Sequence, residues 1–176
     1  MRIWIGSKIM QDKEVISTRA GAIVIHNDCL LLMHRIKGAK EYYVLPGGTV
    51  EADEDIQFAA IREVREETSI VAKPRHLLYH LQVISNEMPS CCKEEYYFLC
   101  DYVQGSPQLE SDAIEQQRIS QNNSYQPMWV SLDQIKDLLI YPLEIRDLLV
   151  DALKNNKMLN LDTKKIKVMR SELRDI

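Results

Sequence analysis

Three glutamates, Glu63, Glu66 and Glu67, stand at the spacing i, i+3 and i+4 in a segment rich in helix-forming residues. On an α-helix this spacing places all three carboxylates on one face, where their like charges repel one another. A hard divalent cation such as Mg²⁺ or Mn²⁺ prefers oxygen ligands and would remove that repulsion. The same pattern also occurs on solvated acidic helix faces, so the surrounding residues must decide between the two interpretations.

The residues that precede the glutamates favour the metal site. Gly47 and Gly48 come just before the expected helix, where a tight loop can expose backbone N–H groups to anions. Glu54, near the expected start of the helix, stands eight residues before Arg62, and an ion pair between the two would orient the helix. The segment therefore combines acidic metal ligands with a loop suited to phosphate groups.

From Gly48 to Ile70 the chain reads GTVEADEDIQFAAIREVREETSI. This segment resembles the Nudix box, G-x5-E-x7-R-E-U-x-E-E-x-G-U, in which U is a bulky apolar residue. The residues in register with it are Gly48, Glu54, Arg62, Glu63, Val64, Glu66, Glu67 and Ile70. Ser69 replaces the second glycine, at a position after the helix where a left-handed backbone is common, and costs about 1 kcal/mol there relative to glycine. We expect this departure to lower stability slightly and to leave the chemistry intact.

The resemblance implies hydrolysis of the pyrophosphate bond of a nucleoside diphosphate derivative. It assigns metal binding and catalysis to the three glutamates, with Mg²⁺ or Mn²⁺ as cofactor, and structural roles to Gly48, Glu54 and Arg62. The spacing does not decide which glutamate accepts the proton of the attacking water. We expect a nucleoside triphosphate or related nucleotide as substrate, with ADP-ribose or another nucleotide conjugate as the alternative. A non-catalytic nucleotide sensor is an alternative of another class, disfavoured because all three glutamates are retained.

Further candidates lie outside the box. Members of the family often add an acidic metal ligand or base from a later strand or loop, and Glu115 and Glu95 are the candidates here. Arg35 could meet phosphates, while Tyr43 and Tyr125 could stack on a base. Each of these residues also has an ordinary interpretation, as a solvated glutamate, a surface ion-pair partner or a packing tyrosine.

The elements that must position these residues can be predicted coarsely. The expected strands are 20–25, 29–33, 42–45, 77–84, 96–103 and 128–130. A turn at 26–28 joins the first two strands, and Pro46-Gly47-Gly48 is expected to end the third. Helices are expected over 53–68 and, with Ser131 as a cap and Pro142 beginning the second, in two stretches up to about 153. The polar stretch 104–126 predicts a long loop.

This order lacks regular βαβ alternation and favours an α+β fold. The resemblance implies an α/β/α sandwich with a mixed central sheet. At 176 residues the chain has room for one compact domain. We expect an N-terminal arm or extra strand over 1–16, the Nudix hydrolase domain over 17–153, and a charged tail, helical or loose, over 154–176.

Composition narrows the class of protein. A hydrophobic fraction of 45% and a charged fraction of 27% are typical of a soluble globular protein. The net charge of −4 argues against broad nucleic-acid binding, and no apolar run is long enough to cross a membrane. The 4 cysteines form no CxxC pair, which favours a reducing, cytoplasmic setting. The expected partners are a small-molecule nucleotide and, in a homodimer, a second copy of the chain.

Overall fold

The computed structural model describes residues 13–109, 116, 119–120, 122–155 and 164–170. Its strands are β1 (Glu14–His26), β2 (Cys29–Lys37), β3 (Lys40–Val44), β4 (Gly47–Thr49), β5 (Val71–Ser85), β6 (Cys91–Gln104), β7 (Asn123–Ser131), β8 (Ile140–Tyr141) and β9 (Lys164–Arg170). Its helices are α1 (Ile56–Thr68), the short 3-10 helix η1 (Ile135–Asp137) and α3 (Leu143–Lys154). Glu115, one of the two acidic candidates outside the box, lies outside the described residues.

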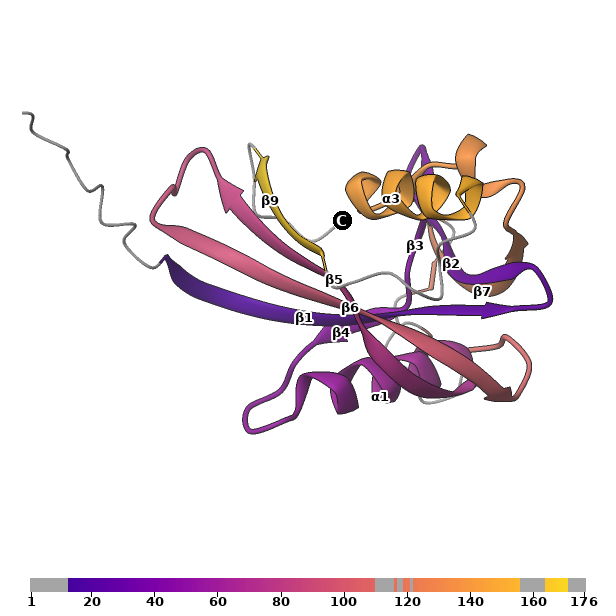
Figure 1. The fold of residues 1–176 in the computed structure, drawn as a ribbon. Coiled ribbons are helices and arrows are strands. Elements are labelled where there is room, and N and C mark those ends of the chain that lie inside the picture. The colour runs from indigo at the N-terminus through magenta and orange to yellow at the C-terminus, as the bar shows by residue number, and fades with distance from the viewer. Residues whose placement is uncertain (1–12, 110–115, 117–118, 121, 156–163, 171–176) are drawn as a thin grey trace, which may run out of the picture.

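The strands form one mixed sheet in the order β8-β3-β2-β1-β6-β5-β9, with β4 paired to β1 and β7 paired to β2. The pairs β1–β6, β3–β8 and β5–β9 are parallel, and the other pairs are antiparallel. Helix α1 covers one face of the sheet and α3 covers the other (Figure 1). The expected α+β fold with a mixed sheet between helices is therefore confirmed.

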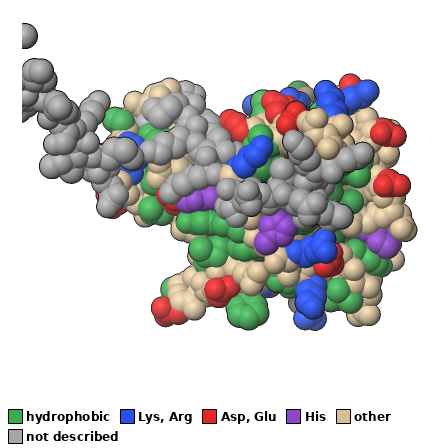
Figure 2. All heavy atoms as spheres, in the orientation of Figure 1, with side chains coloured by type: hydrophobic (Ala, Val, Ile, Leu, Met, Phe, Trp, Pro, Cys, Tyr) green, Lys and Arg blue, Asp and Glu red, His purple; other side chains and the backbone are tan. Residues whose placement is uncertain are grey.

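Two hydrophobic clusters hold the three layers together. Alternate side chains of β1 point to opposite faces of the sheet. Ala20, Ala22 and Val24 pack with α1, whereas Ile23 belongs to the cluster that contains the apolar side of α3. Figure 2 shows hydrophobic side chains gathered between the sheet and α1 on the face in view. From Ala20 to Val24, strand β1 is thus buried on both faces.

The turn between β1 and β2 has the expected position. Asn27 and Asp28 both have a positive φ, 48° and 55°. Two successive residues of this kind form the tight hairpin turn that matches the twist of the flanking strands. The pair His26↔Cys29 closes the hairpin directly next to them.

Helix α1 begins three residues later than predicted. Asp55 is its N-cap, and the Asp55 carboxylate accepts hydrogen bonds from the backbone N–H groups of Gln57 and Phe58 at 2.8 and 3.2 Å. Asp53 has φ 63°, which is incompatible with helix. The acidic residues at 53–55 therefore form the turn and the cap of the helix.

Four other predictions need correction. Gly47–Thr49 does not only end a strand but pairs with β1 as β4. The expected loop 104–126 overlaps β7, which begins at Asn123, and the helix expected after Ser131 is only η1. The described part of the tail, Lys164–Arg170, is a strand instead of a helix or a loose segment, because it pairs with the outer edge of β5. None of the helices in the described ranges is long and apolar enough to span a membrane.

Candidate active site

A bidentate ion pair joins the loop before α1 to the middle of the helix. Arg62 Nε and Nη2 donate to Glu54 Oε1 and Oε2 at 2.8 and 2.9 Å. Hydrogen bonds from Arg62, together with a backbone hydrogen bond from Glu51, lower the pKa of Glu54 to about 2. Arg62 Nη2 also donates to the carbonyl oxygen of Thr49 at 3.3 Å. These contacts join α1 to β4 and to the loop between them.

Glu63 lies directly against Gly48. A Cβ atom on Gly48 would be 2.3 Å from the carboxylate carbon of Glu63, so only glycine permits this approach. The Glu63 side chain is 15% exposed. Burial raises its pKa and outweighs the opposing hydrogen bond from Arg62. The charge of the Glu63 carboxylate is therefore incompletely compensated by the protein.

Two of the three box glutamates share a partner, and the third has a different one. Glu63 Oε1 and Glu66 Oε2 both accept from Arg62 Nη1, at 2.8 and 3.1 Å. Glu67 Oε2 accepts from the backbone N–H of Gly47 at 2.8 Å. The Glu66 side chain is 50% exposed and is the most open to water of the ion-paired glutamates on α1. The helix thus presents two carboxylates around one positive atom, with the third held by the glycine turn.

The chemistry of these donors fits a divalent cation. Glu63 and Glu66 converge on a single cationic nitrogen, a position that a metal ion would favour for the same electrostatic reason. Within the described residues, however, no group of three His, Cys, Asp or Glu side chains is already arranged to hold a metal ion. A cation bound here would therefore compete with Arg62 Nη1 for the carboxylates of Glu63 and Glu66.

Arg19 is a residue of this site that the sequence analysis missed. It lies on β1 opposite Thr49 of β4 on one side and Glu95 of β6 on the other. Burial lowers the pKa of Arg19, but the charges of Tyr97, Glu67, Glu95 and Glu63 raise it more strongly, so that the net shift is upward. A single arginine at the start of an apolar strand is the only signal in the sequence that could have pointed to it.

Glu95, one of the candidate extra ligands, is brought to the same place. Its Oε2 accepts a hydrogen bond from the hydroxyl of Tyr97 at 2.8 Å, and its charge acts on Arg19. The ring of Tyr97 lies over Gly21, where a Cβ atom would be 2.8 Å from the ring. Glu95 is therefore positioned near the box carboxylates by β1 and β6.

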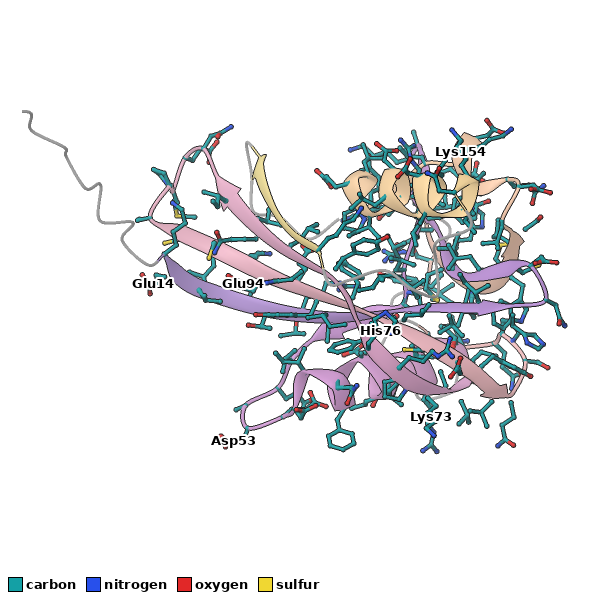
Figure 3. The ribbon with its side chains drawn as sticks, viewed as in Figure 1. Glu14, Asp53, Lys73, His76, Glu94 and Lys154 are labelled. Carbon is teal, nitrogen blue, oxygen red and sulfur yellow. The ribbon has the colours of Figure 1, made fainter. Side chains whose placement is uncertain are left out.

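Glu94, its neighbour in sequence, points to the opposite face of β6 and is buried. Its carboxylate accepts a hydrogen bond from Gln82 at 2.9 Å, contacts His80 and is 3.4 Å from the hydroxyl of Tyr96. Figure 3 shows Glu94 in the part of the sheet that extends beyond both helices, away from the labelled Asp53 in the loop before α1. Its carboxylate is occupied by structural contacts.

The candidate substrate-binding residues lie on β2, β3 and β7. Arg35 places its Cζ atom 3.6 Å from the ring centre of Tyr125, and its buried Nε has no hydrogen-bond partner in the described part of the chain. Tyr43 stacks on His34 with ring centres 4.9 Å apart and lines a hollow of about 410 Å³. These contacts join the three residues to this part of the sheet.

Ser69 adopts the left-handed conformation expected for the glycine position of the box, with φ 55° and ψ 15°. Its backbone N–H donates to the Arg65 carbonyl oxygen and closes the helix. The Ser69 hydroxyl donates to the carbonyl oxygen of Gln108 at 2.9 Å. This bond offsets part of the conformational cost that serine has at this position.

Comparison with known proteins agrees with this geometry. The model of the NUDIX domain matches residues 16–149. A protein of Methanocaldococcus jannaschii named ADP-ribose pyrophosphatase is 30% identical over 103 residues, which cover 58% of this chain and 60% of that protein. The chain thus matches about three fifths of the length of this curated relative.

Solved structures show the same fold. A NUDIX hydrolase from Nitrosomonas europaea superposes with a TM-score of 0.67 at 14% identity, covering 90% of this chain and 82% of that one. The MutT protein from Bacillus halodurans gives 0.60 at 19% identity, covering 86% and 90%. An ADP-ribose pyrophosphatase from Streptococcus suis gives 0.57 at 17% identity, covering 85% and 98%. With a family model matched over most of its length and the box residues gathered at one site, the chain belongs to the Nudix family.

Proposed function

We propose that the protein is a pyrophosphohydrolase that cleaves nucleoside diphosphate derivatives with the help of Mg²⁺ or Mn²⁺. The observation that carries this proposal is the convergence of Glu63 and Glu66 on one cationic atom, beside a Glu67 anchored to the glycine turn. On a merely solvated acidic helix face, Glu63 would not be expected to be buried against Gly48 of β4. The membership of the Nudix family supports the same chemistry.

We infer a role for each residue of the site from its surroundings. Glu63 and Glu67 are held by β4 and would bind the cation, which neutralises phosphate charge and makes a bound water more acidic. Glu66 is half exposed and is best placed to accept a proton from the attacking water. Glu95, fixed by Tyr97, would serve as a further ligand or base. Arg62 and Glu54 keep the helix in place.

We propose two candidate substrates among the nucleoside diphosphate derivatives. A nucleoside triphosphate or related nucleotide is the substrate that we expect from the sequence. ADP-ribose is favoured by the name of the 30% identical relative. We assign contacts with the rest of the nucleotide to Arg35, which is stacked on Tyr125 and whose Nε has no partner among the described residues, and to Tyr43, which lines the hollow of about 410 Å³.

The test is a phosphate-release screen over nucleoside triphosphates, ADP-ribose, dinucleotide polyphosphates and nucleotide sugars, with and without Mg²⁺ or Mn²⁺. A coupled pyrophosphatase or phosphatase converts each product to phosphate. We expect metal-dependent turnover of one class that Glu67→Gln lowers by at least about 100-fold, while the exposed Glu41→Gln, a matched charge change on β3, retains full turnover. Metal-dependent nucleotide binding without turnover by the folded protein would contradict the proposal and support the nucleotide sensor.

A further inference from the structure

Arg19 occupies a position between the two strands that carry the site. On β1 the pairs Arg19↔Thr49, Ala20↔Gly48 and Gly21↔Gly47 place it beside the glycines that receive Glu63 and Glu67. On the other edge of β1, Arg19 faces Glu95. Carboxylates from α1 and from β6 therefore act electrostatically on the guanidinium.

The contacts of Arg19 are long-range. It interacts electrostatically with Glu67, Glu95 and Glu63. Yet among the described residues none forms a hydrogen bond or an ion pair with its guanidinium, in contrast to Arg62, which is saturated by Glu54, Glu63 and Glu66. Arg19 thus supplies positive charge to the site while its planar donors are left for another acceptor. A phosphate group accepts two such donors at once.

We infer that Arg19 exchanges partners during the reaction cycle: it balances the box carboxylates while they hold no cation, and binds a phosphate of the substrate once a cation is bound there. A divalent cation bound to the carboxylates would neutralise the negative charge that attracts the guanidinium. The substrate phosphates would then supply the negative charge that attracts it. This inference rests on the proposed function, because it takes a phosphate-containing substrate and a metal ion as partners.

If Arg19 exchanges partners, its removal should have opposite effects on the affinities for the cation and for the substrate. Removal of a purely structural residue would not. Without Arg19 the site loses a positive charge close to the metal position, so the affinity for a divalent cation in the absence of substrate should rise by about 10-fold. The substrate loses a charge-assisted, bidentate contact, so KM should rise by about 10- to 100-fold. If Arg19 only maintained the fold, its replacement would weaken the binding of both the cation and the substrate.

The experiment compares Arg19→Gln and Arg19→Lys with the wild type. Binding of Mn²⁺ alone is measured by calorimetry, KM and kcat are measured on the substrate that the screen identifies, and folding is checked by thermal unfolding. Arg75→Gln is the matched control, because Arg75 is a half-exposed arginine on β5 paired with Asp101 at 3.3 Å. We expect tighter Mn²⁺ binding for Arg19→Gln only, and a higher KM for both Arg19 variants but not for Arg75→Gln.

Arg19→Lys keeps the charge and loses the planar fork, so its Mn²⁺ affinity should equal that of the wild type while its KM rises. This variant also keeps the test decisive if Arg19→Gln does not fold. Unchanged or weaker Mn²⁺ binding by folded Arg19→Gln, or an unchanged KM in both variants, would overturn the inference. If the wild type itself neither binds Mn²⁺ nor hydrolyses any nucleotide, the proposed function fails instead, so the two failures are distinguishable.

Discussion

Replacing Gly48 by alanine tests whether the chemistry depends on the close approach of β4 and α1. A Cβ atom at this position would lie 2.3 Å from Glu63 Cδ and Oε1 and 2.4 Å from Oε2, whereas ordinary contact begins at 3.4 Å. The carboxylate must therefore retreat by about 1 Å, a displacement that costs a catalytic group on the order of 100-fold in rate. We expect kcat/KM of Gly48→Ala to fall by that factor.

The fold should survive this change. The atoms that clash belong to the end of a flexible side chain, and Gly48 is not among the glycines with positive φ. The control is Gly38→Ala, because Gly38 has φ 61° and nothing within 4 Å of its virtual Cβ. That variant should lose about 1 kcal/mol of stability through backbone strain and retain its activity. Steady-state kinetics and urea unfolding on both variants separate the two effects.

A double-mutant cycle with Glu63→Gln shows whether the fall in kcat/KM of Gly48→Ala is caused by displacement of the Glu63 carboxylate. If it is, Glu63→Gln should cost much less in the Gly48→Ala protein than in the wild type, because the same interaction has already been lost. The reasoning is refuted if Gly48→Ala keeps kcat/KM within about threefold of the wild type, or if the two changes reduce activity independently.

Two further predictions concern stability. Glu54→Gln should lower the free energy of unfolding by about 2 kcal/mol at pH 7, because it removes hydrogen bonds between charged groups. Since the pKa of Glu54 is lowered from 4.5 to about 2, this contribution is complete above about pH 4.5 and is lost as the pH falls toward 2. A difference in urea unfolding between variant and wild type that persists at pH 2 would contradict it. Ser69→Gly relieves a left-handed backbone but removes the bond to the Gln108 carbonyl oxygen, so stability should rise by less than about 1 kcal/mol; Ser69→Ala only loses the bond and should be destabilised by about 1 kcal/mol. Thermal unfolding that ranks the alanine variant above the glycine variant would contradict this prediction.

Helix α1 could be predicted because its sequence signals are local. The spacing of the glutamates places them on one face, and the eight-residue separation of Glu54 and Arg62 matches the observed ion pair. The start of the helix was predicted three residues early because acidic residues favour both the first turn and the N-cap. The conformation of Asp53, with φ 63°, depends on the turn that returns the chain from β4 and leaves no periodic signal.

The missed parts of the fold depend on pairing between distant segments. Asn123–Gln126 is polar and resembles a loop, but it forms strand because β2 supplies a partner from Cys29 to Lys37. Arg19 was overlooked for the same reason. Its role arises only because β1 pairs with β4 and β6 at one position, and no property of its neighbours in sequence reports that pairing.

Strand β9 has a consequence for any shortened version of the protein. It follows the residues that the family model matches and pairs with β5 from Tyr79 to Ser85. A chain cut after α3 would leave the backbone donors and acceptors along this edge of β5 without a strand beside them. Such an edge is a template for pairing with another molecule. Recombinant fragments limited to the matched domain should therefore self-associate through β5, even though every residue of the candidate active site described above is present in them.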